Sequence, residues 1–160
     1  MITDIKINWD EDLFEGDIEF LTGDLRQEIG LTTAVYMSLF TDRRASSDET
    51  LPDPNSKDRK GWWGDALSEY NNDNIGSLLW LLSRAKTIND VLVKAKAYTS
   101  DALAWMVIDG IASKVAVEVL RKDRKDKSSI LSIAIAIHKA DGTKEAISFD
   151  LLWENQFAGG

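Results

Sequence analysis

The last fifty or so residues alternate between apolar and small or polar side chains, and this period of two constrains the fold most. Such alternation is typical of β-strands that bury one face. It runs through Val115–Val119, Leu131–Ile137 and Ile147–Trp153. Asp141-Gly142 is a strong hairpin signal, and the turn between the first two runs is expected at Lys122–Lys127. We therefore predict a three-stranded antiparallel meander at the C-terminus.

The first forty residues predict short strands followed by a helix. Apolar side chains alternate with polar ones in Ile5–Trp9 and again in Ile18–Phe20, as in half-buried strands. Leu31–Thr41 then repeats apolar residues at helical spacing. We expect an amphipathic helix there, with Thr32 or Thr33 as its N-cap.

Helical spacing returns in the middle of the chain. Ser77–Lys86 predicts a short apolar helix. Thr87 and Asp90 have the spacing of a capping box, and the long helix that follows them is expected to end at Gly110. Strands, then two to three helices, then strands make the predicted fold class α+β.

The segment Asp42–Lys60 is the most loop-like part of the chain. It holds both prolines, Pro52 and Pro54, in a polar run. Connections of this length without regular structure are usually functional or disordered. A chain of 160 residues suits one domain. We therefore expect a single domain over residues 1–160 with a flexible loop at 42–60.

Charge and composition exclude several classes of partner. A net charge of −8 repels nucleic acid and anionic membranes, and the mixed-charge run Arg121–Lys127 is better explained as a solvated hairpin loop. The absence of cysteine excludes disulfides, thiolate metal sites and cysteine nucleophiles. The N-terminus has no signal-peptide pattern, and no apolar stretch approaches the ~20 residues that span a bilayer. We expect neither a nucleic-acid nor a membrane partner.

Residues suited to catalysis or metal binding form no recognisable pattern. His138 is the one histidine, and a Ser/His/Asp triad would have to use it, but a surface histidine explains it better. A calcium loop starting at Asp10 requires glycine at its sixth position and glutamate at its twelfth, where Glu15 and Leu21 stand instead. The 27 acidic residues single out no carboxylate pair. We expect no enzymatic activity, cofactor, metal or small-molecule substrate.

Two adjacent tryptophans, Trp62 and Trp63, suggest a contact surface. Tryptophan is enriched at interface hot spots, yet aromatic side chains anchor loops to a core equally well, and both interpretations stay open. The candidate contact residues of this run are Arg59, Gly61, Trp62, Trp63, Gly64 and Asp65. A second surface is expected at the edge of the meander, at Ser148, Asp150 and Leu152, because exposed edges accept strands from other chains.

Several runs of the chain together resemble the Mu-like phage tail baseplate protein family. They are Leu31–Ala45, Asp58–Asp65, Ile75–Leu82, and Ala102–Trp105 followed by Asp109-Gly110. The resemblance extends from about Asp24 into the C-terminal strands, and its most specific piece is the Gly-Trp-Trp-Gly-Asp run. This family is similar to the inner baseplate wedge protein of T-even phages and to its counterpart in P2-like phages.

The resemblance implies a structural protein of the virion tail baseplate, made in the cytoplasm of the bacterial host. It implies contacts with other wedge and hub proteins in the ring around the tail hub. It also implies seeding of the contractile sheath, with a small β-domain offering strands to the tail sheath protein. No catalytic residues come with it. Two alternatives stay open: a small tail-associated cell-wall hydrolase, and an assembly factor that is absent from the finished particle.

Overall fold

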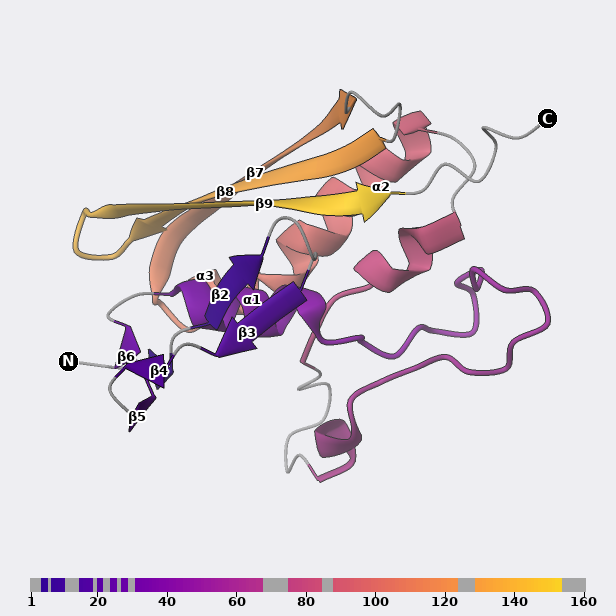
Figure 1. Ribbon diagram of the computed structural model, residues 1–160, viewed down its shortest axis with the longest axis horizontal. Helices are drawn as coiled ribbons and strands as arrows, with labels where there is room; N and C mark the ends of the chain where they lie inside the picture. The colour runs from indigo at the N-terminus through magenta and orange to yellow at the C-terminus, as the bar shows by residue number, and fades with distance from the viewer. Residues whose placement is uncertain are drawn as a thin grey trace.

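The computed structural model describes ten stretches of the chain, to which every structural statement below refers. They are residues 4–5, 7–10, 15–18, 20–21, 24–25, 27–28, 31–67, 75–84, 88–123 and 129–153. Short strands come first, helices follow, and long strands end the described chain, so the class is α+β as predicted (Figure 1). The first strands pair antiparallel as β1 (Asp4–Ile5) with β6 (Gln27–Glu28), β2 (Ile7–Asp10) with β3 (Glu15–Ile18), and β4 (Phe20–Leu21) with β5 (Asp24–Leu25).

The three long strands form the predicted antiparallel meander. They are β7 (Ala112–Asp123), β8 (Ser129–Lys139) and β9 (Lys144–Trp153), in the order β7-β8-β9. Gly142 closes the second hairpin at φ +87°, a conformation that glycine adopts without steric cost. The first turn is shorter than expected, because Lys122 and Asp123 still pair with β8 as strand residues.

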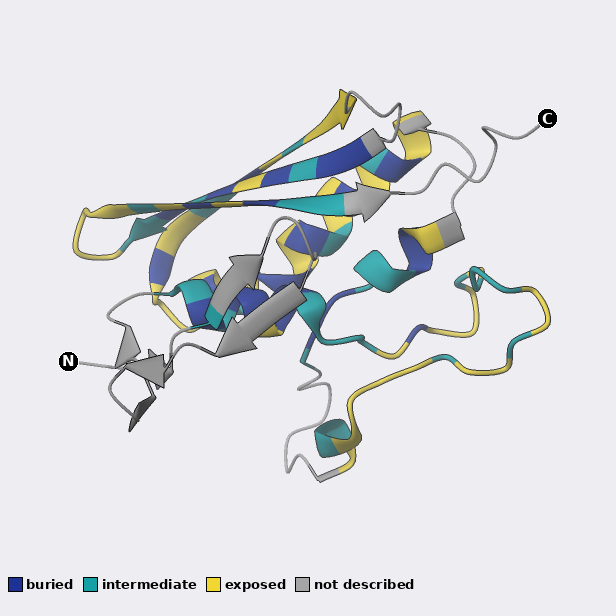
Figure 2. Cartoon of the chain, viewed as in Figure 1, coloured by how far each residue is buried: buried dark blue, intermediate teal, exposed yellow. Residues whose placement is uncertain are grey.

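Side chains alternate between the two faces of this sheet. Val117, Ile135 and Ile147 share one register row on the inner face, and all three are buried. Helices α2 (Ile88–Ala102) and α3 (Trp105–Ile108) pack against β7 on that side. The alternation of buried and exposed positions is visible along the strands in Figure 2. Burial of this face supplies the main hydrophobic stabilisation of the domain.

Helix α1 (Thr32–Phe40) completes the core with an aromatic cluster. The ring centroids of Phe40 and Phe149 lie 5.1 Å apart at 70°, and Tyr36 meets Phe149 edge-on at 6.3 Å. Edge-to-face pairs of this kind stabilise by about 0.5–1.5 kcal/mol beyond the area they bury. The cluster therefore fixes α1 against β9.

The predicted N-cap of α1 was wrong. The N-cap residue is Leu31, which has no side chain able to cap, and neither Thr32 nor Thr33 performs this role. Instead the Glu145 carboxylate on β9 accepts hydrogen bonds from the Leu31 N–H (3.0 Å) and the Thr32 hydroxyl (3.4 Å). The Thr33 hydroxyl accepts a hydrogen bond from the Ile7 N–H of β2. Tertiary structure thus supplies the cap that a local residue was expected to supply.

The helical predictions for the middle of the chain also need correction. The apolar segment after Ser77 forms a 3₁₀ helix, η2 (Leu79–Arg84), in place of an α-helix. The long helix does not continue to Gly110, because bonds of the i→i+3 type tighten the chain between α2 and α3. Gly110 does end α3, at φ +73°. Thr87 of the expected capping box lies outside the described residues.

Candidate functional site

The segment 42–67, here called the arm, leaves the domain after α1 and returns before η2. Figure 1 shows it extending away from the sheet and helices, with the 3₁₀ helix η1 (Trp63–Leu67) at its lower end. Apart from η1 and one isolated bridge residue, the arm contains turns and irregular backbone. It includes the predicted loop 42–60, whose flexibility stays a prediction.

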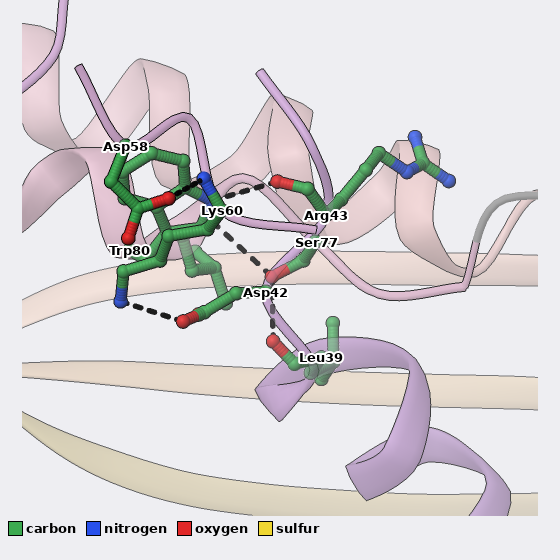
Figure 3. Close-up of polar contacts among 8 residues, drawn as sticks. Leu39, Asp42, Arg43, Asp58, Lys60, Ser77 and Trp80 are labelled. Carbon is green, nitrogen blue, oxygen red and sulfur yellow. Dashed lines mark hydrogen bonds and ion pairs between the residues drawn. The ribbon is translucent and has the colours of Figure 1, made fainter. Parts of the chain in front are cut away.

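Ser77 holds the root of the arm. Its backbone exchanges hydrogen bonds with the Arg43 N–H (3.0 Å) and the Thr41 carbonyl (2.9 Å), which form a short parallel bridge. The buried Ser77 hydroxyl donates to the Leu39 carbonyl at 2.6 Å (Figure 3). A carbonyl in the last turn of α1 thereby accepts a hydrogen bond from a residue that follows the arm in sequence. The segments that enter and leave the arm, here called its two limbs, are therefore held together at Ser77.

Lys60 and Trp80 form a second fixed point beside the root (Figure 3). The Trp80 indole N–H donates to the Arg43 carbonyl at 2.9 Å. The Lys60 ammonium lies 5.1 Å from the Trp80 ring centroid and 2.6 Å from the Asp42 carboxylate. These exposed charges contribute little stability, but they place Lys60 where the chain turns toward the tryptophans.

Arg59 joins the two limbs of the arm. Its guanidinium donates to the carbonyls of Ser46, Ser47 and Glu49, and its own carbonyl accepts a hydrogen bond from the Ala45 N–H. The planar fork of arginine suits several acceptors at once. Arg59, predicted as a contact residue, therefore has an observed role within the arm itself.

Tyr98 of α2 connects the arm to the helical layer. Its hydroxyl donates to the Glu49 carboxylate at 3.3 Å. Partial burial, the negative charge of Glu49 and this hydrogen bond all raise the pKa of Tyr98. The phenol therefore remains a protonated donor throughout the physiological range.

The paired tryptophans project from this braced support. Trp63 is 74% exposed and Trp62 is 40% exposed, so neither indole is a core anchor in the isolated chain. Their ring centroids lie 5.3 Å apart at 46°. The Trp62 ring occupies the space that a Cβ at position 64 would need, which explains the glycine there.

The remaining residues of this run shape the backbone. Lys60 and Gly61 adopt positive φ angles of 46° and 123°, and thereby redirect the chain just before the tryptophans. The Asp65 N–H donates to the Trp62 carbonyl, and its carboxylate accepts a hydrogen bond from the Ile75 N–H. Gly61 and Asp65 thus shape the backbone that presents the indoles, and their role as contact residues stays a prediction.

The second predicted surface lies apart from the arm, on the outer face of the meander. Ser148 is exposed there, and Asp150 pairs with Lys122 across the sheet at 3.2 Å. Leu152 follows in the same register, opposite Ile130. Among the described strands β9 pairs with β8 alone, so its other edge carries no described partner.

The outer face also carries the single histidine. Glu118, His138 and Ser148 line an open hollow of about 390 Å³ there, with a residue on each strand. A catalytic triad requires hydrogen bonds between its side chains, and no hydrogen bond joins these three. Nor do the described residues contain a group of three or more His, Asp or Glu that could hold a metal ion. Within the described chain, no helix has the length and hydropathy needed to cross a membrane.

Sequence reasoning missed one further feature near the root of the arm. A hollow of about 230 Å³ opens between the end of α1, η2 and the ends of β8 and β9. Its apolar lining combines buried and partly exposed side chains, which in sequence resemble ordinary core positions. Only the tertiary arrangement distinguishes them.

Comparison with known proteins gives consistent matches over most of the chain. A family model described as Phage protein GP46 matches residues 31–144, which include the whole arm. The chain is 45% identical to "Baseplate protein gp46" of Escherichia phage Mu over 119 residues, which cover 72% of this chain and 76% of that protein. It is 35% identical to "Mu-like prophage FluMu protein gp46" of Haemophilus influenzae over 153 residues, covering 95% and 98% respectively.

Proposed function

The chain belongs to the phage protein GP46 family, and from this membership we propose that it is a structural protein of a Mu-like tail baseplate. It acts by protein–protein contact in the wedges of the baseplate, with other wedge and hub proteins as neighbours. Its place is the tail of the virion. Surfaces that internal contacts hold in place before binding lose less entropy on docking, and hydrogen bonds of Arg59 and Ser77 link the segments on either side of the arm.

One observation carries the proposed mode of action: the exposed Trp63 indole on a loop whose two limbs are joined by hydrogen bonds. A tryptophan that is 74% exposed gains nothing for the fold of the isolated chain. Buried in a partner's pocket, the same side chain becomes the kind of anchor that dominates interface energies. The hydrogen bonds of Arg59 and Ser77 reduce the entropy lost when the arm docks.

The edge of β9 that has no partner among the described strands provides a second contact in this proposal. Strand addition satisfies backbone groups that an edge leaves unpaired. Ser148 and Asp150 lie along this strand on the outer face, and Leu152 follows them in the strand register. The tail sheath protein is the proposed donor of the added strand, which would couple the baseplate to the first sheath ring.

Electron microscopy of purified particles with labelled antibodies tests the location. Label at the head-distal end of both extended and contracted tails is expected for a baseplate subunit. Protein found only in the lysate, with unlabelled tails, would instead support an assembly factor that leaves the particle. A cell-wall hydrolase makes a different prediction, since the purified chain would then clear a peptidoglycan suspension.

A Trp63→Ala variant tests the mode of action. The side chain is exposed, so the variant should fold with the far-UV spectrum and unfolding midpoint of the parent. Its incorporation into tails should nevertheless fall, because truncating a hot spot costs ~2 kcal/mol or more in binding. Ile108→Ala is the matched control, since Ile108 is 81% exposed but lies outside the arm.

A further inference from the structure

The hollow at the root of the arm is apolar and has a polar rim. Its walls include Phe40, Leu79, Trp80 and Leu151, each partly exposed. Asp42 and Ser83 stand at its margin. The core side chains beneath it are buried, so the hollow is a feature of the finished fold and not a gap in its packing.

The size of this hollow suits a single large side chain. Its volume of about 230 Å³ is below the ~300–1,000 Å³ typical of small-molecule sites. An apolar cavity of ~150 Å³ accommodates benzene, which has six ring atoms. An indole has nine, and 230 Å³ is larger in about the same proportion. The hollow is therefore large enough to receive a tryptophan side chain.

The chain itself carries such a side chain at a different place. Trp63 is exposed at the start of η1, which lies at the lower end of the arm (Figure 1). Residues of η2 and β9 line the hollow. The Lys60 ammonium lies over the Trp80 ring, with its charge paired to Asp42. Each molecule thus presents both a projecting indole and a hollow that could receive one.

The side chain charges beside the Trp63 indole and beside the hollow have opposite signs. Arg44 lies against Gly61, next to the tryptophans, and the Arg44 guanidinium donates only to the Lys60 carbonyl within the described chain. Asp42 at the rim of the hollow pairs with Lys60 through Oδ2, which leaves Oδ1 unengaged by the described residues. Docking of the indole of one copy into the hollow of another would bring the Arg44 guanidinium of the first copy toward this Asp42 oxygen of the second.

We propose that Trp63 of one copy inserts into the hollow of a second copy, so that copies of this chain join head to tail. In a head-to-tail contact each copy gives its indole to one neighbour and receives an indole from another, and repeated contacts of this kind close into a ring when the rotation permits. Association of the parent chain that stops at a dimer would instead indicate a reciprocal exchange between two copies and would overturn the head-to-tail arrangement. The link to a ring of wedges rests on the proposed function. The contact between copies does not, since the isolated protein tests it.

Analytical ultracentrifugation of the purified chain over a wide concentration range measures this contact. The parent chain is expected to show association that grows with concentration. Trp63→Ala should weaken it roughly 30-fold, the loss typical of a truncated hot spot. Ser83→Arg should weaken it similarly, because an arginine at this exposed position fills the mouth of the hollow without entering the core. Ile108→Ala should associate like the parent.

Mixing the two defective variants gives the sharpest result. A Ser83→Arg chain retains its tryptophan, and a Trp63→Ala chain retains its hollow, so a mixture can form one contact per pair and no more. Each variant alone should remain monomeric, whereas the mixture should form heterodimers that do not grow further with concentration.

Several outcomes would overturn the inference. A parent chain that stays monomeric at every concentration excludes the contact, whether Trp63 is then free or folded into its own hollow. Association that Ser83→Arg leaves intact would indicate a symmetric tryptophan-to-tryptophan contact. Either result leaves the baseplate location untouched, because that location is tested on particles. Conversely, unlabelled tails with intact self-association would refute the proposed function alone.

Discussion

The carboxylate of Glu145 lies 3.0 Å from the backbone nitrogen of Leu31, a residue 114 positions earlier in the chain. Glu145 also pairs with Lys139 at 2.7 Å. One side chain at the start of β9 therefore completes the N-terminus of α1 and neutralises a lysine of β8. A negative charge at this end of a helix also interacts favourably with the helix dipole.

Removing this cap should destabilise the domain. Glu145→Ala leaves the N–H of Leu31, the N-cap residue of α1, and the Lys139 ammonium without their carboxylate, and we expect a loss of about 2 kcal/mol in the free energy of unfolding. Glu145→Gln keeps an acceptor oxygen but loses the charge, so it should recover roughly half of this loss. Urea unfolding of the three proteins measures both values. Equal stability of parent and alanine variant would show that water replaces the cap.

The same contact predicts a dependence on pH. Partial burial alone would raise the pKa of Glu145, but the hydrogen bonds from Lys139, Leu31 and Thr32 and the charge of Lys139 together lower it below its ordinary value of 4.5. A carboxyl whose pKa is lower in the folded state stabilises the fold above its unfolded pKa. That contribution disappears as pH falls through the folded-state pKa. The stability difference between parent and Glu145→Gln should therefore be constant near neutrality and shrink below about pH 4.5.

The sheet could be predicted from sequence because its signals are local. Each strand shows its period of two over neighbouring residues, and Asp141-Gly142 marks a hairpin without reference to the rest of the chain. The cap of α1 could not be predicted in this way. Glu145 reaches Leu31 only after the meander and the helix have packed together. The helix predicted after Ser77 is present as η2, but its 3₁₀ geometry could not be predicted from sequence. The Ser77 that precedes it is held by Leu39 and Thr41, which are distant in sequence.

In the candidate site too, features with a local sequence signal could be predicted, whereas features that depend on tertiary contacts could not. Two adjacent tryptophans could be identified as unusual from sequence, but the same letters suit a core anchor or an interface. Exposure of Trp63 depends on how Arg59 and Ser77 hold the two limbs of the arm, and these contacts span the whole loop. The hollow beside η2 combines residues from four elements, and no local pattern points to it.

Two glycines with positive φ angles should respond very differently to alanine. Gly76 has φ +104°, and a Cβ there would collide with the Thr41 carbonyl at the root of the arm. Gly110 has φ +73°, and no atom lies within 4 Å of the position its Cβ would take. We expect Gly110→Ala to cost about 1 kcal/mol from backbone strain alone. Gly76→Ala should cost at least ~2 kcal/mol more, because backbone atoms must move. Thermal unfolding of both variants makes the comparison, and similar midpoints would contradict it.

Arg59 should control local opening of the arm without controlling the stability of the domain. Arg59→Lys keeps the positive charge but loses the fork that engages the carbonyls of Ser47 and Glu49. We expect a glutamate-specific protease to cleave after Glu49 about tenfold faster, as local opening becomes ~1.4 kcal/mol easier. The global unfolding midpoint should stay within about a degree of the parent, because the core is untouched. Arg121→Lys is the control, since among the described residues Arg121 on β7 engages its neighbour Asp123 and no other side chain. Equal cleavage of the parent and the Arg59 variant would mean that the Ser77 root, and not Arg59, holds the arm closed.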